Sequence, residues 1–212
     1  PDGVPDGVID DYDKTNIGSP MPKFTFGWTN TFRYKNFDLS VFINGSYGNK
    51  VYNYLSMKLT HMNSPWTNQL NAVNGRAQLV PINPNKVYED GTMWYNDVSN
   101  VMVANPGASI PRATINDPND NDRISDRYIE DGSYIRLKNI SLGYTFPKKT
   151  IDKLGLSNLR IYANIQNLLT ITGYDGYDPE IGASTSSVNV YGLDNGRYPS
   201  PTVYSFGLNV SF

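Results

Sequence analysis

Five segments of the chain alternate, position by position, between large apolar residues and small or polar ones. In the segment over residues 202–212, the residues between the apolar ones are serine, glycine or asparagine. Its apolar residues are Tyr204, Phe206, Leu208, Val210 and Phe212. Because successive side chains of a β-strand point to opposite faces, this pattern predicts a strand with one apolar and one polar face. A strand of a soluble β-sandwich is compatible with this segment taken alone.

Four further segments repeat the pattern, near residues 23–34, 37–48, 134–146 and 158–168. Each alternating run is about ten residues long, the length of a tilted strand that crosses a bilayer. Aromatic residues at the strand ends fit the girdles found at membrane interfaces. These aromatic residues are Tyr34, Phe37, Tyr47, Tyr144, Phe146 and Phe212.

The links between these segments alternate between short and long. Residues 35–36 and 147–158 form short links, whereas residues 48–133 and 171–201 form long ones. Outer-membrane barrels combine short periplasmic turns with long extracellular loops, and a soluble sandwich has no reason to place every long loop at one end. We therefore predict an all-β, transmembrane antiparallel β-barrel with Phe212 at the periplasmic face. Five strands cannot close such a barrel, so we interpret the chain as a fragment of a longer protein.

Composition excludes several function classes. The chain has no cysteine and a formal net charge of −2, so neither thiol chemistry nor nucleic-acid binding is indicated. His61 is the only histidine, which argues against a catalytic triad based on histidine. No stretch approaches the roughly 18–20 consecutive apolar residues of a membrane helix. The low mean hydropathy is compatible with a barrel, in which only alternate residues face lipid.

The acidic segment over residues 1–22, an expected extracellular loop, resembles a twelve-residue calcium loop in its spacing. Counting from Asp2, glycine falls at position six and oxygen donors fall at positions five, seven, nine and twelve. The candidate ligands are Asp2, Asp6, the carbonyl of Val8, Asp10 and Asp13. Val4 at position three and an aspartate at position twelve depart from the pattern. A solvated acidic turn with Ile9 packed inward is the alternative.

A second acidic cluster occupies residues 117–122 of the longer link, and its spacing matches no ligand template. A solvated loop is expected there.

Aromatic rings in the long links are candidates for stacking on sugars or packing against peptides. Polar residues on the predicted inner face are candidates for contact with a passing substrate. The candidate substrate-binding residues are Trp66, Tyr88, Trp94, Tyr95, Tyr174, Tyr177, Asn44, Asn164 and Gln166. Alternatively, the rings pack within their own loops, and the polar residues hydrate the barrel wall.

Two cations interrupt the pattern of residues 134–146. Arg136 and Lys138 share the parity of Ile140 and Leu142, so on a regular strand they would point outward. Charge on the lipid face costs about 2–4 kcal/mol at mid-bilayer. We therefore expect either that both side chains lie above the hydrocarbon or that a β-bulge intervenes.

Long strings, spread over the chain in order, resemble the C-terminal part of the SusC/RagA family of TonB-dependent outer-membrane transporters. They are DGVIDDYDKT at 6–15, YKNFDLS at 34–40, DRYIEDGSYIRLKNISLGY at 126–144, LRIY at 159–162, QNL at 166–168, YDGYDPE at 174–180 and FGLNV at 206–210. The link between residues 50 and 125 is the weakest part of the match.

The resemblance implies that residues 1–212 are the C-terminal part of one barrel domain and supply the last five of 22 strands. It implies localisation in the outer membrane of a Gram-negative bacterium and a plug domain outside this sequence. It further implies a SusD-like lipoprotein as a lid, a dimer of transporter–lipoprotein pairs, and TonB acting through the absent N-terminal region. The implied substrates are oligosaccharides or oligopeptides.

The leading hypothesis is therefore TonB-dependent import of oligomeric nutrients. A passive porin, or a surface-binding barrel without energy coupling, is the second hypothesis, and a soluble β-sandwich lectin is the third. An enzyme is the weakest hypothesis, because no set of nucleophile, base and orienting group is visible. Ca²⁺ is the one cofactor that the sequence suggests.

Overall fold

The computed structural model describes residues 9–117, 119–180 and 190–212. The chain forms two compact units. The sheet unit comprises Asn16–Asn53 and Ile129–Phe212, and the loop unit comprises Pro1–Thr15 and Tyr54–Tyr128. Within the described ranges, no helix is both long and apolar enough to cross a membrane.

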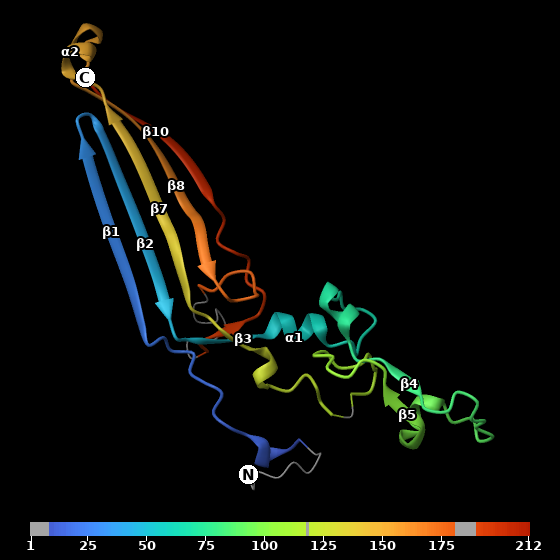
Figure 1. The fold of residues 1–212 in the computed structure, drawn as a ribbon. Coiled ribbons are helices and arrows are strands. Elements are labelled where there is room, and N and C mark those ends of the chain that lie inside the picture. The colour runs from blue at the N-terminus through green and yellow to red at the C-terminus, as the bar shows by residue number, and fades with distance from the viewer. Residues whose placement is uncertain (1–8, 118, 181–189) are drawn as a thin grey trace. The chain divides into compact units, whose positions relative to one another are not determined.

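The sheet unit is built on a five-stranded antiparallel sheet in which each strand pairs with the next one along the chain (Figure 1). The strands are β1 (Phe24–Tyr34), β2 (Phe37–Tyr47), β7 (Tyr134–Thr145), β8 (Asn158–Thr172) and β10 (Val203–Ser211). This up-and-down order is that of a barrel wall, and the predicted fold class is confirmed as a partial β-barrel. Four strands end within one residue of the predicted bounds, whereas β8 continues four residues beyond the predicted end.

The register aligns the apolar side chains in rows across the sheet. One row consists of Phe32, Leu39, Leu142, Ala163 and Phe206, and the next consists of Tyr34, Phe37, Tyr144, Ile161 and Leu208. Phe206 is 84% exposed, so this face is not covered by other described parts of the chain. An apolar face of this size requires a partner or an apolar solvent.

The short links lie at one end of the sheet. Residues 35–36 join β1 to β2, and Lys35 adopts a left-handed φ of 53° there. The side-chain amide of Asn36 donates to the carbonyl of Thr145 at 2.8 Å, which joins this turn to the end of β7. The other short link contains α2 (Lys148–Ile151) and the 3₁₀ turn η6 (Asp152–Leu154). Both links lie at the end of the sheet where the chain reaches Phe212 (Figure 1).

The long links begin and end at the opposite end, where a second sheet forms within the same unit. It contains β6 (Ile129–Asp131), β3 (Lys50–Asn53) and β9 (Leu193–Asp194) in that order. Val51, Asp194 and Tyr174 are buried around it. This small core was not predicted, and it joins segments from both long links.

The loop unit contains mainly short elements. They are η1 (Asp11–Asp13), α1 (Tyr54–Thr60), η2 (Asn71–Gly75), β4 (Leu79–Pro81), η3 (Trp94–Asn96), η4 (Val98–Asn100), β5 (Val101–Val103) and η5 (Asp126–Tyr128). β4 and β5 form an antiparallel pair. Met57 and Tyr128 are its buried large apolar residues among those described.

Candidate functional site

A β-bulge in β7 determines which side chains reach the polar face of the sheet. Phe42 of β2 pairs with Asn139, and the next residue, Ile43, pairs with Leu137, so Lys138 is the extra residue. In the residues of β7 that precede the bulge, the side chains that face each side of the sheet are therefore exchanged. Arg136 therefore pairs with Asn44, which lies on the polar face. Of the two expectations, a β-bulge is therefore the one that the register shows, and it turns Arg136 to the polar face.

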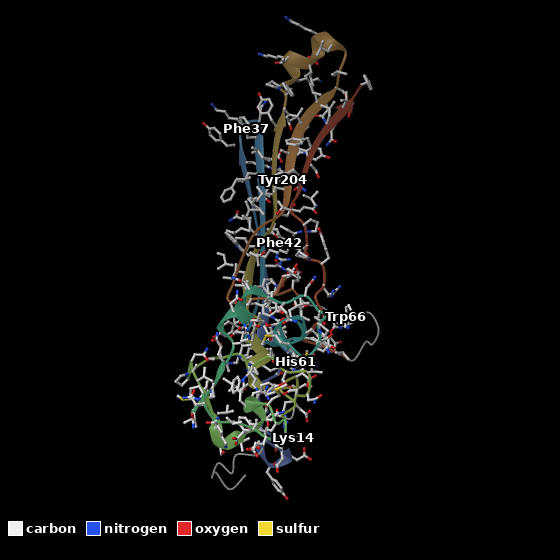
Figure 2. The ribbon with its side chains drawn as sticks, turned by 90° about the vertical axis from the view of Figure 1, so that its right-hand side faces the viewer. Lys14, Phe37, Phe42, His61, Trp66 and Tyr204 are labelled. Carbon is white, nitrogen blue, oxygen red and sulfur yellow. The ribbon has the colours of Figure 1, made fainter. Side chains whose placement is uncertain are left out.

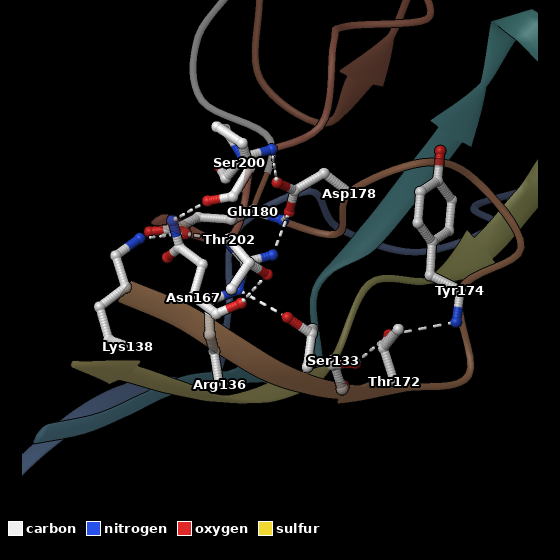
Figure 3. A network of polar contacts seen from close by, with 12 residues as sticks. Ser133, Arg136, Lys138, Asn167, Thr172, Tyr174, Asp178, Glu180, Ser200 and Thr202 are labelled. Atoms are coloured by element: carbon white, nitrogen blue, oxygen red, sulfur yellow. Dashed lines mark hydrogen bonds and ion pairs between the residues drawn. The ribbon is translucent and has the colours of Figure 1, made fainter. Parts of the chain in front are cut away.

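The pairing of β7 with β8 also shifts in register near the bulge. On β8 this irregularity falls at Asn167, whose φ is 52°. Asparagine tolerates this left-handed conformation better than most residues. The Asn167 side chain donates to the carbonyl of Pro201 at 3.1 Å, and the hydroxyl of Thr202 donates to the carbonyl of Asn167 at 2.9 Å (Figure 3). The irregularity therefore anchors the start of β10.

Arg136 forms the centre of a buried ionic network on the polar face (Figure 3). Its guanidinium donates to Asp178, to Glu180 at 2.6 Å and to the hydroxyl of Thr170 at 2.8 Å. Lys138 donates to the same oxygen of Glu180 at 2.6 Å. Arg136 is only 3% exposed. The network therefore holds the loop segment 174–180 against the loop end of β7 and β8.

Asp178 also accepts backbone hydrogen bonds. The amide of Ser200 donates to it at 3.0 Å and the amide of Glu180 at 2.9 Å. Burial would raise the pKa of Asp178. The hydrogen bonds from Arg136, Ser200 and Glu180 outweigh burial and lower the pKa to about 2. Asp178 thus joins the beginning of this loop to its end.

Acidification is expected to loosen this loop. The folded-state pKa of Asp178 lies below the usual 3.8, so its contribution is complete above about pH 4 and is lost as the pH falls toward 2. The shift corresponds to about 2 kcal/mol. Hydrogen exchange between pH 6 and pH 3, corrected for intrinsic rates, should show the amides of Glu180 and Ser200 losing protection below pH 4. The same pH dependence in Asp178→Asn would contradict this assignment.

Tyr174 lies in the core of the same unit. Its hydroxyl donates to Asp194 at 2.6 Å, and burial and this hydrogen bond together raise the pKa of Tyr174. The neighbouring Asp175 amide donates to Glu130 at 2.9 Å. Tyr177, three residues after Tyr174, is exposed. For both tyrosines, contact with a substrate stays a prediction.

The polar residues predicted on the wall lie on one face. Asn44 pairs with Gly27, Asn164 pairs with Ser141 and Ser205, and Gln166 pairs with Asn139. The side-chain oxygen of Asn44 is buried and accepts no hydrogen bond from the described residues. Amide and hydroxyl groups in these rows can exchange hydrogen bonds with a polar solute, and that role stays a prediction.

A second set of contacts organises the polar face near the short links. Arg160 pairs with Asp38 at 2.6 Å, and its guanidinium lies 5.1 Å from the centre of the Tyr162 ring. Gly143 and Gly207 leave room for these side chains, because a Cβ at either glycine would overlap Arg160 or Tyr162, respectively. From the sequence, alternation alone could be read at these strand positions, and nothing in it indicated that Arg160 pairs with Asp38.

The candidate aromatic residues of the loop unit differ in their exposure and contacts. Trp66 is 93% exposed (Figure 2). The hydroxyl of Tyr88 donates to Asp97 at 3.0 Å and accepts from Asn100 at 2.9 Å. Trp94 and Tyr95 pack edge to face with ring centroids 5.7 Å apart. Their contact with a substrate stays a prediction.

The N-terminal acidic segment is described only in part. Asp2, Asp6 and Val8 lie outside the described residues. Asp10 caps the 3₁₀ turn η1 by accepting from the amide of Tyr12 at 2.8 Å, and Asp13 accepts from the amide of Asp10 at 2.9 Å. The calcium site stays a prediction.

The chain is similar to several receptors. It is 36% identical to TonB-dependent receptor P3 of Formosa agariphila over 97% of its length, and 29% identical to TonB-dependent receptor SusC of Bacteroides thetaiotaomicron over 97%. It covers 18% and 17% of these proteins, respectively, so it spans about a fifth of the curated relatives it matches. No family model matches.

The fold is also similar to a solved structure, that of the RagAB peptide transporter. The TM-score is 0.64 with 20% sequence identity, over 92% of this chain and 18% of that one. The receptor relatives match nearly the whole chain in sequence, and the solved structure has a part whose fold is similar to the five-stranded sheet unit and its loops. The chain belongs to the SusC/RagA family of TonB-dependent receptors.

Proposed function

We propose that the chain is part of a transporter that uses TonB to import oligomeric nutrients across the outer membrane of a Gram-negative bacterium. The observation that carries the proposal is the two-faced five-stranded sheet, with an apolar outer face and a polar inner face. The polar rows suit a wall along which a hydrophilic solute moves, and the apolar rows suit lipid.

The substrates in this proposal are oligosaccharides or oligopeptides. Support for the peptide class comes from the RagAB structure, which is described as a peptide transporter. Exposed aromatic rings such as Trp66 and Tyr177 suit either class, because a flat ring stacks on a sugar face or packs against a peptide side chain. The proposal is one of transport and not of catalysis, in keeping with relatives that are named receptors.

The proposed partners are a SusD-like lipoprotein that closes the loop end of the barrel, and TonB, which would act on a region outside this sequence. A dimer of transporter–lipoprotein pairs completes the proposed assembly. We also propose that Ca²⁺ binds the segment 2–13, where hard oxygen donors have the spacing of a calcium loop.

Growth of the native bacterium on single nutrients tests the function. Deleting the gene for the complete protein should abolish growth on one class of oligosaccharide or oligopeptide, and a plasmid-borne wild-type copy should restore it. Deleting the TonB gene should abolish the same growth, whereas a small sugar or amino acid should still support it. Growth on the oligomer that persists without TonB would favour a passive porin instead.

A further inference from the structure

The folded loop unit brings the one histidine of the chain onto the second acidic cluster. His61 comes directly after α1, and its Nε2 lies 2.9 Å from a carboxylate oxygen of Asp117. Its Nδ1 lies 3.8 Å from a carboxylate oxygen of Asp122. The side chains of His61 and Asp117 are each 9% exposed, and that of Asp122 is 42% exposed. Figure 2 shows His61 within this unit.

The three side chains lie close to the separation that one shared metal ion requires. One ligand atom from each residue lies within 4.8 Å of the other two. Ligands of a tetrahedral zinc ion lie about 2.0–2.2 Å from the metal and hence about 3.5 Å from one another. Coordination of one ion by all three residues would therefore require side-chain rotations that bring the ligand atoms closer together.

A cavity of about 10 Å³ borders two of the three side chains, His61 and Asp117, and is lined by Asn121 and Thr114 among others. This volume is near the lower limit for one water molecule, so the two side chains border a space of about the size of a small ion.

Hydrogen bonds from a neighbouring residue orient the carboxylate of Asp117. The backbone amide of Asn121 donates to one oxygen of Asp117 at 2.5 Å, and its side-chain amide donates to the other oxygen at 2.6 Å. Burial acts to raise the pKa of Asp117, but these bonds and the contact with His61 lower it overall, so the carboxylate is ionised at neutral pH. Metal sites use such outer contacts to fix their ligands.

We propose that His61, Asp117 and Asp122 bind a Zn²⁺ ion. One imidazole nitrogen and two carboxylate oxygens are ligands that zinc accepts, and three protein ligands leave its fourth position open. The ion would join the end of α1 to a segment 56 residues further along the chain, and closing a link of that length reduces the freedom of the loop unit. The proposal is independent of the proposed transport function.

Zinc titration of the complete protein in detergent, with any affinity tag removed and metal stripped by a chelator, tests the site. The wild type should bind Zn²⁺ at this site, and His61→Gln and Asp122→Asn should each weaken that binding at least tenfold. Co²⁺ in place of Zn²⁺ should give visible absorption bands that both variants lose.

Asp120→Asn is the matched control, because Asp120 lies in the same segment, is 79% exposed and is not one of the three candidate ligands. It should bind zinc like the wild type. Equal binding by wild type and Asp122→Asn, or an equal loss in Asp120→Asn, would overturn the proposal and leave His61 and Asp117 as a hydrogen-bonded pair only. Asp122 is the most exposed of the three ligands, so its variant decides the question even if His61→Gln fails to fold.

Discussion

Replacing Arg136 with methionine is expected to destabilise the loop that carries Asp178 and Glu180 by about 3–5 kcal/mol. Removing one partner of a buried ion pair leaves the other charge without compensation, and this penalty exceeds the net value of the intact pair. Arg136 is buried and bonds to both carboxylates, so its loss leaves Asp178 charged in a site only 9% exposed. Hydrogen exchange at the Glu180 and Ser200 amides should show the loss of protection directly.

Arg160→Met provides the matched control. Arg160 also pairs with a carboxylate on the polar face, but it and Asp38 are each more than a quarter exposed. This pair is less buried than that of Arg136 and lies near the short links, so the control should leave the loop amides protected. A double variant, Arg136→Met with Asp178→Asn, should be less destabilised than the sum of the single variants. Additive losses, or equal losses in the control, would show that the network does not hold the loop.

Placing a charge on the apolar face is the second change with a large expected effect. Leu142→Arg would put a guanidinium in the row that contains Leu39 and Phe206. An arginine facing lipid costs about 2–4 kcal/mol near mid-bilayer. Urea unfolding of the complete protein from bilayers should show this loss, and less folded protein should be recovered from outer membranes.

Ser141→Arg is the control for that change, because Ser141 is the neighbouring residue and faces the polar side with Ser40 and Asn164. Its replacement should cost less than about 1 kcal/mol, since water or polar groups solvate the charge. Similar losses for the two variants would mean that the two faces do not meet different solvents.

The strands of the large sheet could be predicted because alternation is a local property. Most residues of β1, β2 and β10 show their face through their own side chains, although Phe42 lies on the polar face, and the bounds agree within one residue. The end of β8 could not be predicted, because the irregularity at Asn167 interrupts the period of two before the strand resumes. Sequence alone left the direction of Arg136 open between two geometries, and the register of β2 against β7 decided it.

Contacts between segments that are distant in the sequence could not be predicted, for a different reason. The small sheet pairs Lys50 with Asp131, but its strands have only two to four residues, too few to show a period. The approach of His61 to Asp117 depends on how an irregular link folds back over 56 residues, and no ligand spacing signals it. Such features follow from loop packing and not from local pattern.

We propose that the five-stranded sheet is a membrane wall with one face toward lipid. The chain has no cysteine of its own, so single cysteines can be introduced along β10 of the complete protein, with any cysteine elsewhere in it replaced, and labelled with a nitroxide. Collision rates with oxygen should peak at Tyr204, Phe206 and Leu208, and those with a water-soluble nickel chelate should peak at Ser205 and Asn209. Equal access of the nickel chelate to both sets of positions would show that neither face of β10 meets lipid.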